Sequence, residues 1–282
     1  MFSLNDVTIL LLSRNHEKFI AECINSINRE FGNEIQLLNL DIGSIDDTFR
    51  LCKSLCNEFG INATHVKLEK GTKTLTVLKN LEEYVSTNYV ILLSADDALG
   101  KNYSQALNKL FSSITEYAVI NFPSMVTDQN LQPLFLRVPK WSRSAKSNKK
   151  LLSYSNPGTA PGAVIPWRIL VETQSWKQSP DIIIEDYWLW WQFIDIAPFI
   201  TSQESYVLYR QHQHNISSES RNVDYAYSLG YVSALPRNKS NNSTNRLLSL
   251  LLIPRWLRHL NIAVWRNYFS GYQASKRSAL TR

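Results

Sequence analysis

"VILLSADDAL", residues 90–99, is the stretch that decides the fold. Its first half is a run of apolar residues, which is typical of a strand buried on both faces of a sheet. The run stops on two adjacent carboxylates, Asp96 and Asp97, and acidic side chains are rarely buried without a partner. The stretch therefore predicts a buried strand that brings two carboxylates to the end of a sheet, where another group must neutralise them.

The chain before this strand alternates between the two patterns of regular structure. Apolar runs with strand character stand between segments whose apolar residues recur every three or four positions, as in an amphipathic helix. Strands are predicted at residues 7–13, 34–41 and 64–68, and helices at residues 16–31, 46–58 and 73–86. This alternation predicts an α/β fold with a mostly parallel, doubly wound sheet covered by helices on both faces.

The pattern after residue 100 is less regular. A helix and two strands are predicted within residues 101–137, followed by a basic loop at 140–150 and a Gly/Pro-rich segment at 155–166 that re-enters the fold. Residues 184–194 predict a helix that begins with two acids and is apolar almost throughout. We expect this helix to be buried.

Polar residues gather where the predicted strands end. In a parallel sheet, ligands bind beyond the carboxyl ends of the strands. Three clusters fall there: Ser13, Arg14 and Asn15 after the first strand, Asp41 at the end of the second, and Ser94, Asp96 and Asp97 at the end of the fourth. We therefore expect the three clusters to converge on one crevice.

Asp96 and Asp97 allow two interpretations: a turn closed by side-chain hydrogen bonds, or a site for a divalent cation. Taken alone, the pair favours the turn. The chain contains neither a G-x-G-x-x-G loop nor a Walker lysine motif, so a cation bridged to a diphosphate is how this crevice could hold a nucleotide. The context therefore favours the cation site.

Two further groups offer chemistry, each with a simpler alternative. Glu185 and Asp186 open the Trp-rich helix, where they either compensate the helix dipole or supply a general base whose pKa is raised by the apolar wall. His212 and His214 stand two residues apart, which places both on one face of an extended segment. Such pairs are most often structural, and metal binding is the alternative.

The chain of 282 residues carries a formal charge of +6, which is unevenly distributed. Nine of its 30 bases follow residue 236, and no acid follows Asp224. The segment 246–269 mixes Leu and Trp with Arg, so it is either an interfacial helix on an anionic membrane or a helix packed on the main domain. We predict a main domain at residues 1–235 and a basic, amphipathic helical extension at residues 236–282.

Cysteine usage and hydropathy bear on the compartment. Three cysteines, an odd number, make no disulfide framework and favour a reducing environment. The first residues lack the basic region of a signal peptide, and the longest late apolar run, residues 247–254, is far shorter than the roughly 20 residues of a membrane span. We expect a cytoplasmic protein that can lie on the inner face of the cytoplasmic membrane.

Five stretches, taken together, resemble an inverting glycosyltransferase of family 2, which has the GT-A fold with a Rossmann-like sheet. They follow the family's order: "VTILLLSRNHEKFIAECINSI", "LLNLDIGSIDDT", "YVILLSADDAL", "IIIEDYWLWWQF" and "YRQHQHNIS". The resemblance runs from about residue 5 to residue 217. The set is specific, although each motif alone is weak.

The resemblance implies a role for each group. Asp186 is implied as the general base that deprotonates an acceptor hydroxyl. Asp96 with Asp97 is implied to hold Mn²⁺ or Mg²⁺ on the donor diphosphate, and His212 is implied to lie near the metal. The nucleotide-sugar contacts implied are Ser13, Arg14, Asn15, Asp41, Ser94 and Asp96, with Lys79 as a weaker candidate.

The implied reaction moves a sugar from a nucleoside-diphosphate sugar, with a preference for UDP, to a hydroxyl of a glycan acceptor. The implied acceptor is linked to polyprenyl diphosphate, as in bacterial surface-polysaccharide assembly of the O-antigen or capsule type. Such an acceptor suits a basic extension that contacts the cytoplasmic membrane. We expect no nucleic-acid partner, because acids gather at the strand ends and the basic tail is hydrophobic.

Three positions depart from the family's pattern. Ile42 follows Asp41 where the family often has a second acid, Ser94 stands in place of an acid, and Arg14 replaces a common Tyr. These departures leave a second function open, that of a catalytically silent nucleotide-sugar-binding or scaffolding protein on the same fold.

Overall fold

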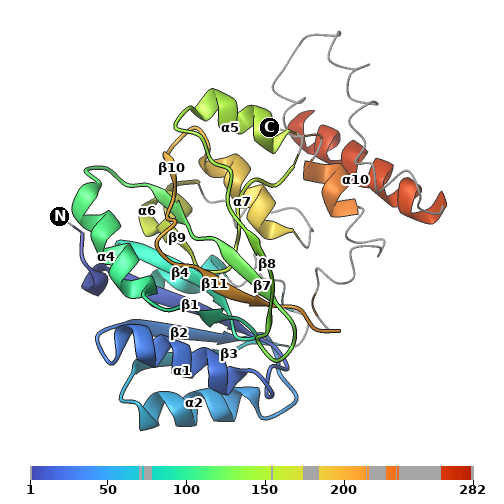
Figure 1. Ribbon diagram of the computed structural model, residues 1–282. Coiled ribbons are helices and arrows are strands. Elements are labelled where there is room, and N and C mark those ends of the chain that lie inside the picture. The colour runs from blue at the N-terminus through green and yellow to red at the C-terminus, as the bar shows by residue number, and fades with distance from the viewer. Residues whose placement is uncertain are drawn as a thin grey trace.

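The computed structural model describes residues 2–69, 72, 78–153, 155–173, 184–213, 215, 227–232, 234 and 262–280. Its centre is a seven-stranded sheet with the order β10-β6-β9-β4-β1-β2-β3 (Figure 1). The strands are β1 (Val7–Ser13), β2 (Gln36–Asp41), β3 (Asn62–Lys67), β4 (Tyr89–Ser94), β6 (Val119–Asn121), β9 (Ala163–Pro166) and β10 (Phe199–Thr201). β9 is antiparallel to β4 and β6, and the other pairs are parallel, so the predicted mostly parallel sheet is confirmed.

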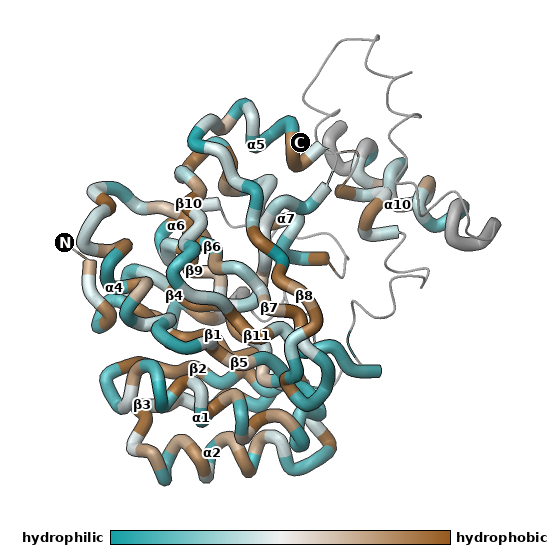
Figure 2. The backbone as a smooth tube through the Cα atoms, in the orientation of Figure 1, coloured by the Kyte–Doolittle hydropathy of each residue, from teal (hydrophilic) through white to brown (hydrophobic). Residues whose placement is uncertain are grey.

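A second sheet of four short strands has the order β5-β11-β7-β8. Its strands are β5 (Ala98–Leu99), β7 (Ser124–Thr127), β8 (Pro133–Arg137) and β11 (Val207–Arg210). β5 follows β4 directly after the two aspartates, and β11 pairs antiparallel with β5. The pairing brings the chain that follows β11 beside the carboxyl end of β4. The edge strand β8 leaves Leu134, Phe135 and Leu136 about half exposed, and they contribute to its brown colour in Figure 2.

Helices cover both faces of the large sheet, as predicted (Figure 1). One face carries α1 (Ile20–Phe31), α2 (Thr48–Glu58) and α4 (Tyr103–Ser113), and the other carries α5 (Ala145–Leu152), α6 (Trp167–Thr173) and α7 (Glu185–Phe193). Successive residues of β1 alternate between the two cores, Ile9 toward α1 and Leu10 toward α7. Burial on both faces explains why the central strands β1 and β4 are apolar at most positions.

Three local expectations differ from the structure. The helix expected over 73–86 is described only from residue 78, as the 3-10 helix η2 (Leu78–Glu83); another short 3-10 helix, η1 (Leu4–Asp6), precedes β1. The loop expected at 140–150 contains α5, whose polar sequence shows little apolar periodicity and whose first turn is capped by the Ser144 side chain. α1 begins at Ile20 rather than at residue 16, because residues 16–19 form a turn in which the His16 carbonyl accepts from the Phe19 and Ile20 N–H groups.

The last described helix, α10 (Ile262–Leu280), packs closely on a helical segment at residues 227–232. A Cβ atom at Gly230 would lie 1.8 Å from the carbonyl oxygen of Tyr268, so only glycine allows this approach. Tyr231 of the same segment packs on Trp188 of α7, with ring centroids 6.0 Å apart. Residues 247–254 lie outside the described residues. Among the helices that the structure describes, none has the length and apolar composition to cross a membrane.

Candidate active site

The carboxyl ends of β1, β2 and β4 lie side by side, because β1 pairs in parallel with both other strands. Ser13 is in register with Asp41, and Leu12 is in register with Ser94. The loops that follow these strands therefore begin at one edge of the sheet. This is the edge where ligands bind in open parallel sheets.

Asp41 and Ser13 form a buried, hydrogen-bonded corner at this edge. Asp41 Oδ1 accepts a hydrogen bond from the Ser44 N–H (2.8 Å), which closes the loop between β2 and α2. Ser13 Oγ donates to Asn39 Oδ1 (3.0 Å) and to Asp41 Oδ2 (3.4 Å). Asp41 is thus engaged in holding its own loop, and its contact with a nucleotide stays a prediction.

The loop after β1 is fastened to the loop after β2. The Asn15 N–H donates to Ser44 Oγ (3.0 Å), and Asn15 Oδ1 accepts from the Ile45 N–H (3.0 Å). The His16 N–H donates to Thr48 Oγ1 (2.7 Å). The left-handed conformation of Asn15, held by these bonds, turns the chain between the end of β1 and the start of α1.

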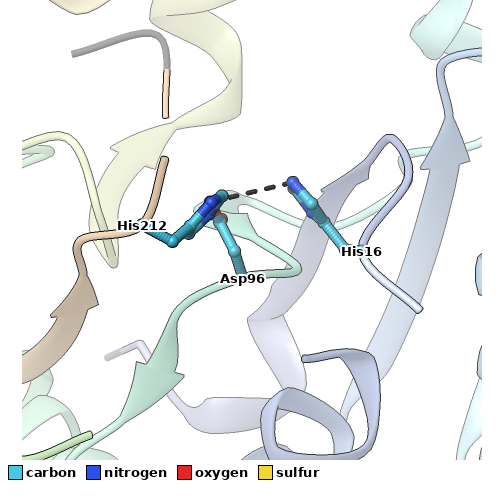
Figure 3. Close-up of side chains that lie close together, drawn as sticks. All are labelled: His16, Asp96 and His212. Carbon is cyan, nitrogen blue, oxygen red and sulfur yellow. Dashed lines mark hydrogen bonds and ion pairs between the residues drawn. The ribbon is translucent and has the colours of Figure 1, made fainter. Parts of the chain in front are cut away.

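Asp96 is the centre of a cluster that joins three distant segments of the chain (Figure 3). Its Oδ2 lies 3.0 Å from His212 Nε2, which follows β11, and 3.7 Å from His16 Nε2, which follows β1. One ligand atom from each residue lies within 4.8 Å of the other two. The predicted neighbours Asp96 and His212 are therefore in contact, and His16 joins them.

The electrostatics of the cluster fit a divalent cation. Burial alone would raise the pKa of Asp96, but the hydrogen bond with His212 and the field of His16 lower it below its ordinary value. Burial lowers the pKa of His16, which favours the neutral imidazole that a metal ligand requires. Asp96 Oδ1 and His16 Nδ1 are buried and find no hydrogen-bond partner in the described part of the chain. Buried polar atoms without a partner are positions where an ion, a ligand or an ordered water can bind.

Asp97 faces away from this cluster. Its N–H donates to the Ser94 carbonyl (3.0 Å), and its Oδ1 accepts from the Arg210 N–H (2.9 Å). Burial and the charge of Asp96 raise the pKa of Asp97 well above its ordinary value. The pair therefore forms a turn at Asp97, and the cation site at Asp96 stays a prediction. The role of Asp97 as a metal ligand stays a prediction.

Arg210 holds the aspartate turn in place, although the sequence analysis did not select it as a site residue. The side chain is almost fully buried. Its guanidinium donates to the Asp96 carbonyl (2.7 Å), to the Gln129 carbonyl (2.5 Å) and to Glu22 Oε2 (2.5 Å), and it stacks on Phe19 at 4.6 Å from the ring centroid. Its position two residues before His212 in the "YRQH" stretch was the available signal.

Asp186 lies in the first turn of α7, where Asn156 Nδ2 donates to its Oδ2 (2.6 Å). Burial raises the pKa of Asp186, and the hydrogen bond from Asn156 and the charge of Arg137 offset only part of this effect. The Arg137 guanidinium also donates to the Asn156 and Gly158 carbonyls (3.3 and 3.2 Å). A Cβ at Gly158 would lie 2.8 Å from Trp190 Nε1, so this loop is pressed against the Trp-rich helix that carries Asp186.

The remaining predicted residues are only partly described. Arg14 is exposed on the loop after β1. The side chain of Lys79 and the whole of His214 lie outside the described residues. Ser94 ends β4, and its side chain adds a hydrogen bond that lowers the pKa of Asp96.

Two solved structures share the fold of this chain at low sequence identity. The S. aureus protein TarS, residues 1–349, in complex with UDP-GlcNAc, has a TM-score of 0.69 and 12% identity over 97% of this chain and 81% of that one. The mannosyltransferase PcManGT of Pyrobaculum calidifontis, in complex with GDP-Man and Mn²⁺, has a TM-score of 0.59 and 12% identity over 96% and 75% of the two chains.

Sequence comparison gives the family. A curated relative, the teichoic acid poly(glycerol phosphate) polymerase of Staphylococcus epidermidis, is 26% identical over 96 residues. That match covers 34% of this chain and 13% of the polymerase, so the chain matches only a small part of that protein's length. Residues 8–165, more than half of the chain, match the model of Glycosyl transferase family 2. The chain therefore belongs to glycosyltransferase family 2 and has the GT-A fold of that family.

Proposed function

We propose that this protein is a metal-dependent, inverting glycosyltransferase that moves a sugar from a UDP-sugar to a hydroxyl of a cell-surface glycan. The observation that carries the proposal is the buried Asp96 cluster at the carboxyl edge of β4, with its unsatisfied oxygen and two imidazoles. UDP is favoured as the donor nucleotide because TarS, whose TM-score is higher than that of PcManGT, holds UDP-GlcNAc.

In the proposed reaction, Asp96 and His212 bind the divalent cation. A bound divalent ion supplies charge stabilisation for the leaving nucleoside diphosphate. Five residues on or beside the same sheet edge are proposed to contact the nucleoside and ribose: Ser13, Arg14, Asn15, Asp41 and Ser94. Lys79 is a further candidate.

Asp186 is proposed as the general base. Its raised pKa brings the carboxylate closer to the range in which a base accepts a proton efficiently. The acceptor hydroxyl loses its proton to Asp186, its oxygen bonds to the anomeric carbon, and the diphosphate leaves with the electrons of the broken carbon–oxygen bond. Attack from the side opposite the diphosphate inverts the configuration at that carbon.

The acceptor is proposed to be a surface polymer precursor linked to polyprenyl diphosphate. The name of the S. epidermidis relative supports a cell-wall polymer of the teichoic acid kind as well as an O-antigen or capsule type. We propose that the chain works on the inner face of the cytoplasmic membrane, supported by the exposed Arg266 and Arg277 of α10. Co-sedimentation with vesicles containing anionic lipid tests this location, and equal recovery with neutral vesicles would contradict an electrostatic contact.

A catalytically silent nucleotide-sugar-binding or scaffolding protein is the second candidate. Ile42, which takes the place of an acid common in the family, packs into the core beside the strand edge. One nucleoside contact of the family is therefore replaced by an apolar side chain. Donor binding without transfer to any acceptor, and without slow hydrolysis of the donor, would favour this candidate.

The test is calorimetric titration of UDP, GDP and CMP in the presence of Mn²⁺ or of EDTA, on the native chain and on Asp96→Asn. We expect UDP to bind with Mn²⁺, and the binding to vanish with EDTA and in the variant. UDP-sugars would then be screened against lipid-linked acceptors. Absence of nucleotide binding under every condition would overturn the proposal.

A further inference from the structure

His16 is the member of the Asp96 cluster to which the family pattern assigns no role. Its imidazole and that of His212 both face the Asp96 carboxylate (Figure 3). The two ring planes are 82° apart and their centroids are 6.3 Å apart, so the rings do not stack on each other. Both rings instead direct a nitrogen to the same carboxylate oxygen, Asp96 Oδ2.

The backbone holds His16 in place independently of this contact. Its N–H donates to Thr48 Oγ1, and its carbonyl accepts from the Phe19 and Ile20 N–H groups at 2.9 Å each. The preceding residue, Asn15, is fastened to the β2–α2 loop by two hydrogen bonds. The imidazole is therefore presented by a rigid turn, which is the condition for a preformed ligand position.

The distances within the cluster are close to those of a coordination shell. Metal bonds to imidazole nitrogen or carboxylate oxygen are about 2.0–2.2 Å long, which puts neighbouring ligand atoms roughly 3.0–3.6 Å apart. The two imidazole-to-carboxylate distances are 3.0 and 3.7 Å. The three ligand atoms all lie within 4.8 Å of one another, so a closer approach of the side chains would bring them onto one ion.

The alternative is that His16 only neutralises Asp96. His212 Nε2 already donates a hydrogen bond to Asp96 Oδ2 (3.0 Å), and the Arg210 guanidinium donates to the Asp96 carbonyl. An ion pair through Oδ2 alone would leave Asp96 Oδ1 buried without a partner among the residues described. A cation bound by both oxygens of the carboxylate would also occupy Oδ1, which favours a cation over a simple ion pair.

We propose that His16 is a third protein ligand of the divalent cation, so that the site is built from two imidazoles and one carboxylate and binds its ion before the nucleotide. The inference rests on the proposed function, because the transfer reaction is what requires a cation at this site. A donor set rich in imidazole favours ions of the transition series, such as Mn²⁺ and Co²⁺, over Mg²⁺, which takes oxygen ligands and gives up its water reluctantly.

The test uses the metal alone. Free Mn²⁺ is measured by electron paramagnetic resonance while the full chain is titrated without nucleotide, and Mg²⁺ is added as a competitor. We expect one Mn²⁺ per chain that a large excess of Mg²⁺ displaces poorly. Co²⁺ in the same site is expected to show the visible absorption of a nitrogen-ligated ion.

Substitutions at His16 separate ligation from neutralisation. His16→Gln is expected to weaken Mn²⁺ binding by roughly 10- to 100-fold or more. Even the loss of a residue that only hydrogen-bonds to a metal ligand lowers metal affinity by this factor. His16→Asp is expected to keep an ion in the site but to shift the preference toward Mg²⁺, because it exchanges a nitrogen ligand for oxygen. His65→Gln removes an imidazole outside the cluster and serves as the matched control, with unchanged Mn²⁺ affinity.

Failure of this inference and failure of the proposed function give different results. Unchanged Mn²⁺ affinity in His16→Gln, or Mn²⁺ binding that requires UDP in the native chain, would overturn the inference while leaving the transferase intact. Tight Mn²⁺ binding that depends on His16, together with no nucleotide binding, would support the ligand and overturn the proposed function. Circular dichroism of each variant confirms that the fold is retained.

Discussion

Asp96 and Asp186 are chemically identical carboxylates in two regions of the molecule, one after the central strand β4 and one in the first turn of α7. At Asp96, two imidazoles outweigh the effect of burial and lower the pKa. At Asp186, burial outweighs the hydrogen bond from Asn156 and the charge of Arg137 and raises the pKa. The fold thus shifts the pKa values of the two carboxylates in opposite directions, which fits the different roles proposed for them.

The largest effect is expected from removal of the base. Asp186→Asn is expected to lower kcat by roughly 10²–10⁴-fold, because the acceptor hydroxyl loses its proton acceptor. The Kd for UDP with Mn²⁺ should stay within about twofold, since the residue acts on the acceptor. Steady-state transfer assays and calorimetry measure the two quantities.

Asp195→Asn is the matched control for this prediction. Asp195 follows the other end of α7, is exposed and pairs with Lys149, and such surface ion pairs contribute little. We expect normal kcat in this variant. A loss of UDP affinity in Asp186→Asn as large as its loss of kcat would contradict the division of roles between the two carboxylates.

A second effect should appear in binding. Asp96→Asn is expected to weaken UDP binding in the presence of Mn²⁺ by roughly 10- to 100-fold, because it removes the only carboxylate in the described cluster. Asp97→Asn should weaken it less, since Asp97 faces the Arg210 N–H. Calorimetry on both variants measures their UDP affinity in the presence of Mn²⁺. An equal loss of affinity in the two variants would show that both aspartates are ligands.

A smaller effect is expected at the residue that positions the aspartate turn. Arg210→Lys keeps the charge but cannot reach the Asp96 carbonyl, the Gln129 carbonyl and Glu22 together. Mn²⁺ affinity should fall by about tenfold. The exposed Arg50, exchanged for Lys, is the control, and equal Mn²⁺ affinity in both variants would exclude the positioning role.

The smallest effect is on stability, and its sign differs between the two carboxylates. The raised pKa of Asp186 means that its ionised form is disfavoured by folding at pH values above its ordinary 3.8. Asp186→Asn should therefore raise the unfolding temperature at neutral pH, and the gain should shrink as the pH falls toward 3.8. The lowered pKa of Asp96 gives the opposite expectation.

Asp96→Asn should lower the unfolding temperature at neutral pH in EDTA, because ionised Asp96 favours the folded state above its ordinary pKa of 3.8. That loss should diminish as the pH falls below this value, where the native carboxylate is protonated too. Thermal unfolding at about pH 2.5, pH 4 and pH 7.5 measures both variants. The same sign of change in both would contradict the contrast between the two sites.

Much of the fold follows from periodicity in the sequence. The apolar runs of β1, β2 and β4 and the amphipathic pattern of α1 are long enough to identify the parallel sheet and its covering helices. The second sheet was not recognised, although β8 lies within a strand predicted from sequence, because β5, β7 and β11 have only two to four residues each, too few to show a period. The polar sequence of α5 likewise looks like a loop until its capping serine is considered.

Asp96 and Asp186 were identified as candidates from sequence because each follows or begins an apolar element, where a carboxylate is conspicuous. His16 and Arg210 were missed for the opposite reason. A single histidine in a polar turn is common, and the only local signal for Arg210 was its place in the "YRQH" stretch.

The sequence by itself determined the alternation of strands and helices, the polar groups at the carboxyl ends of the strands and the two conspicuous acids, because these depend on the order of side chains along a short segment. Only the tertiary structure decided which imidazoles meet Asp96 and which groups oppose its burial. Those partners are up to 116 residues away in the chain, and the Arg210–Glu22 contact spans 188. Contacts of this range depend on strand order and loop geometry, and they set the pKa of each carboxylate through burial and charge.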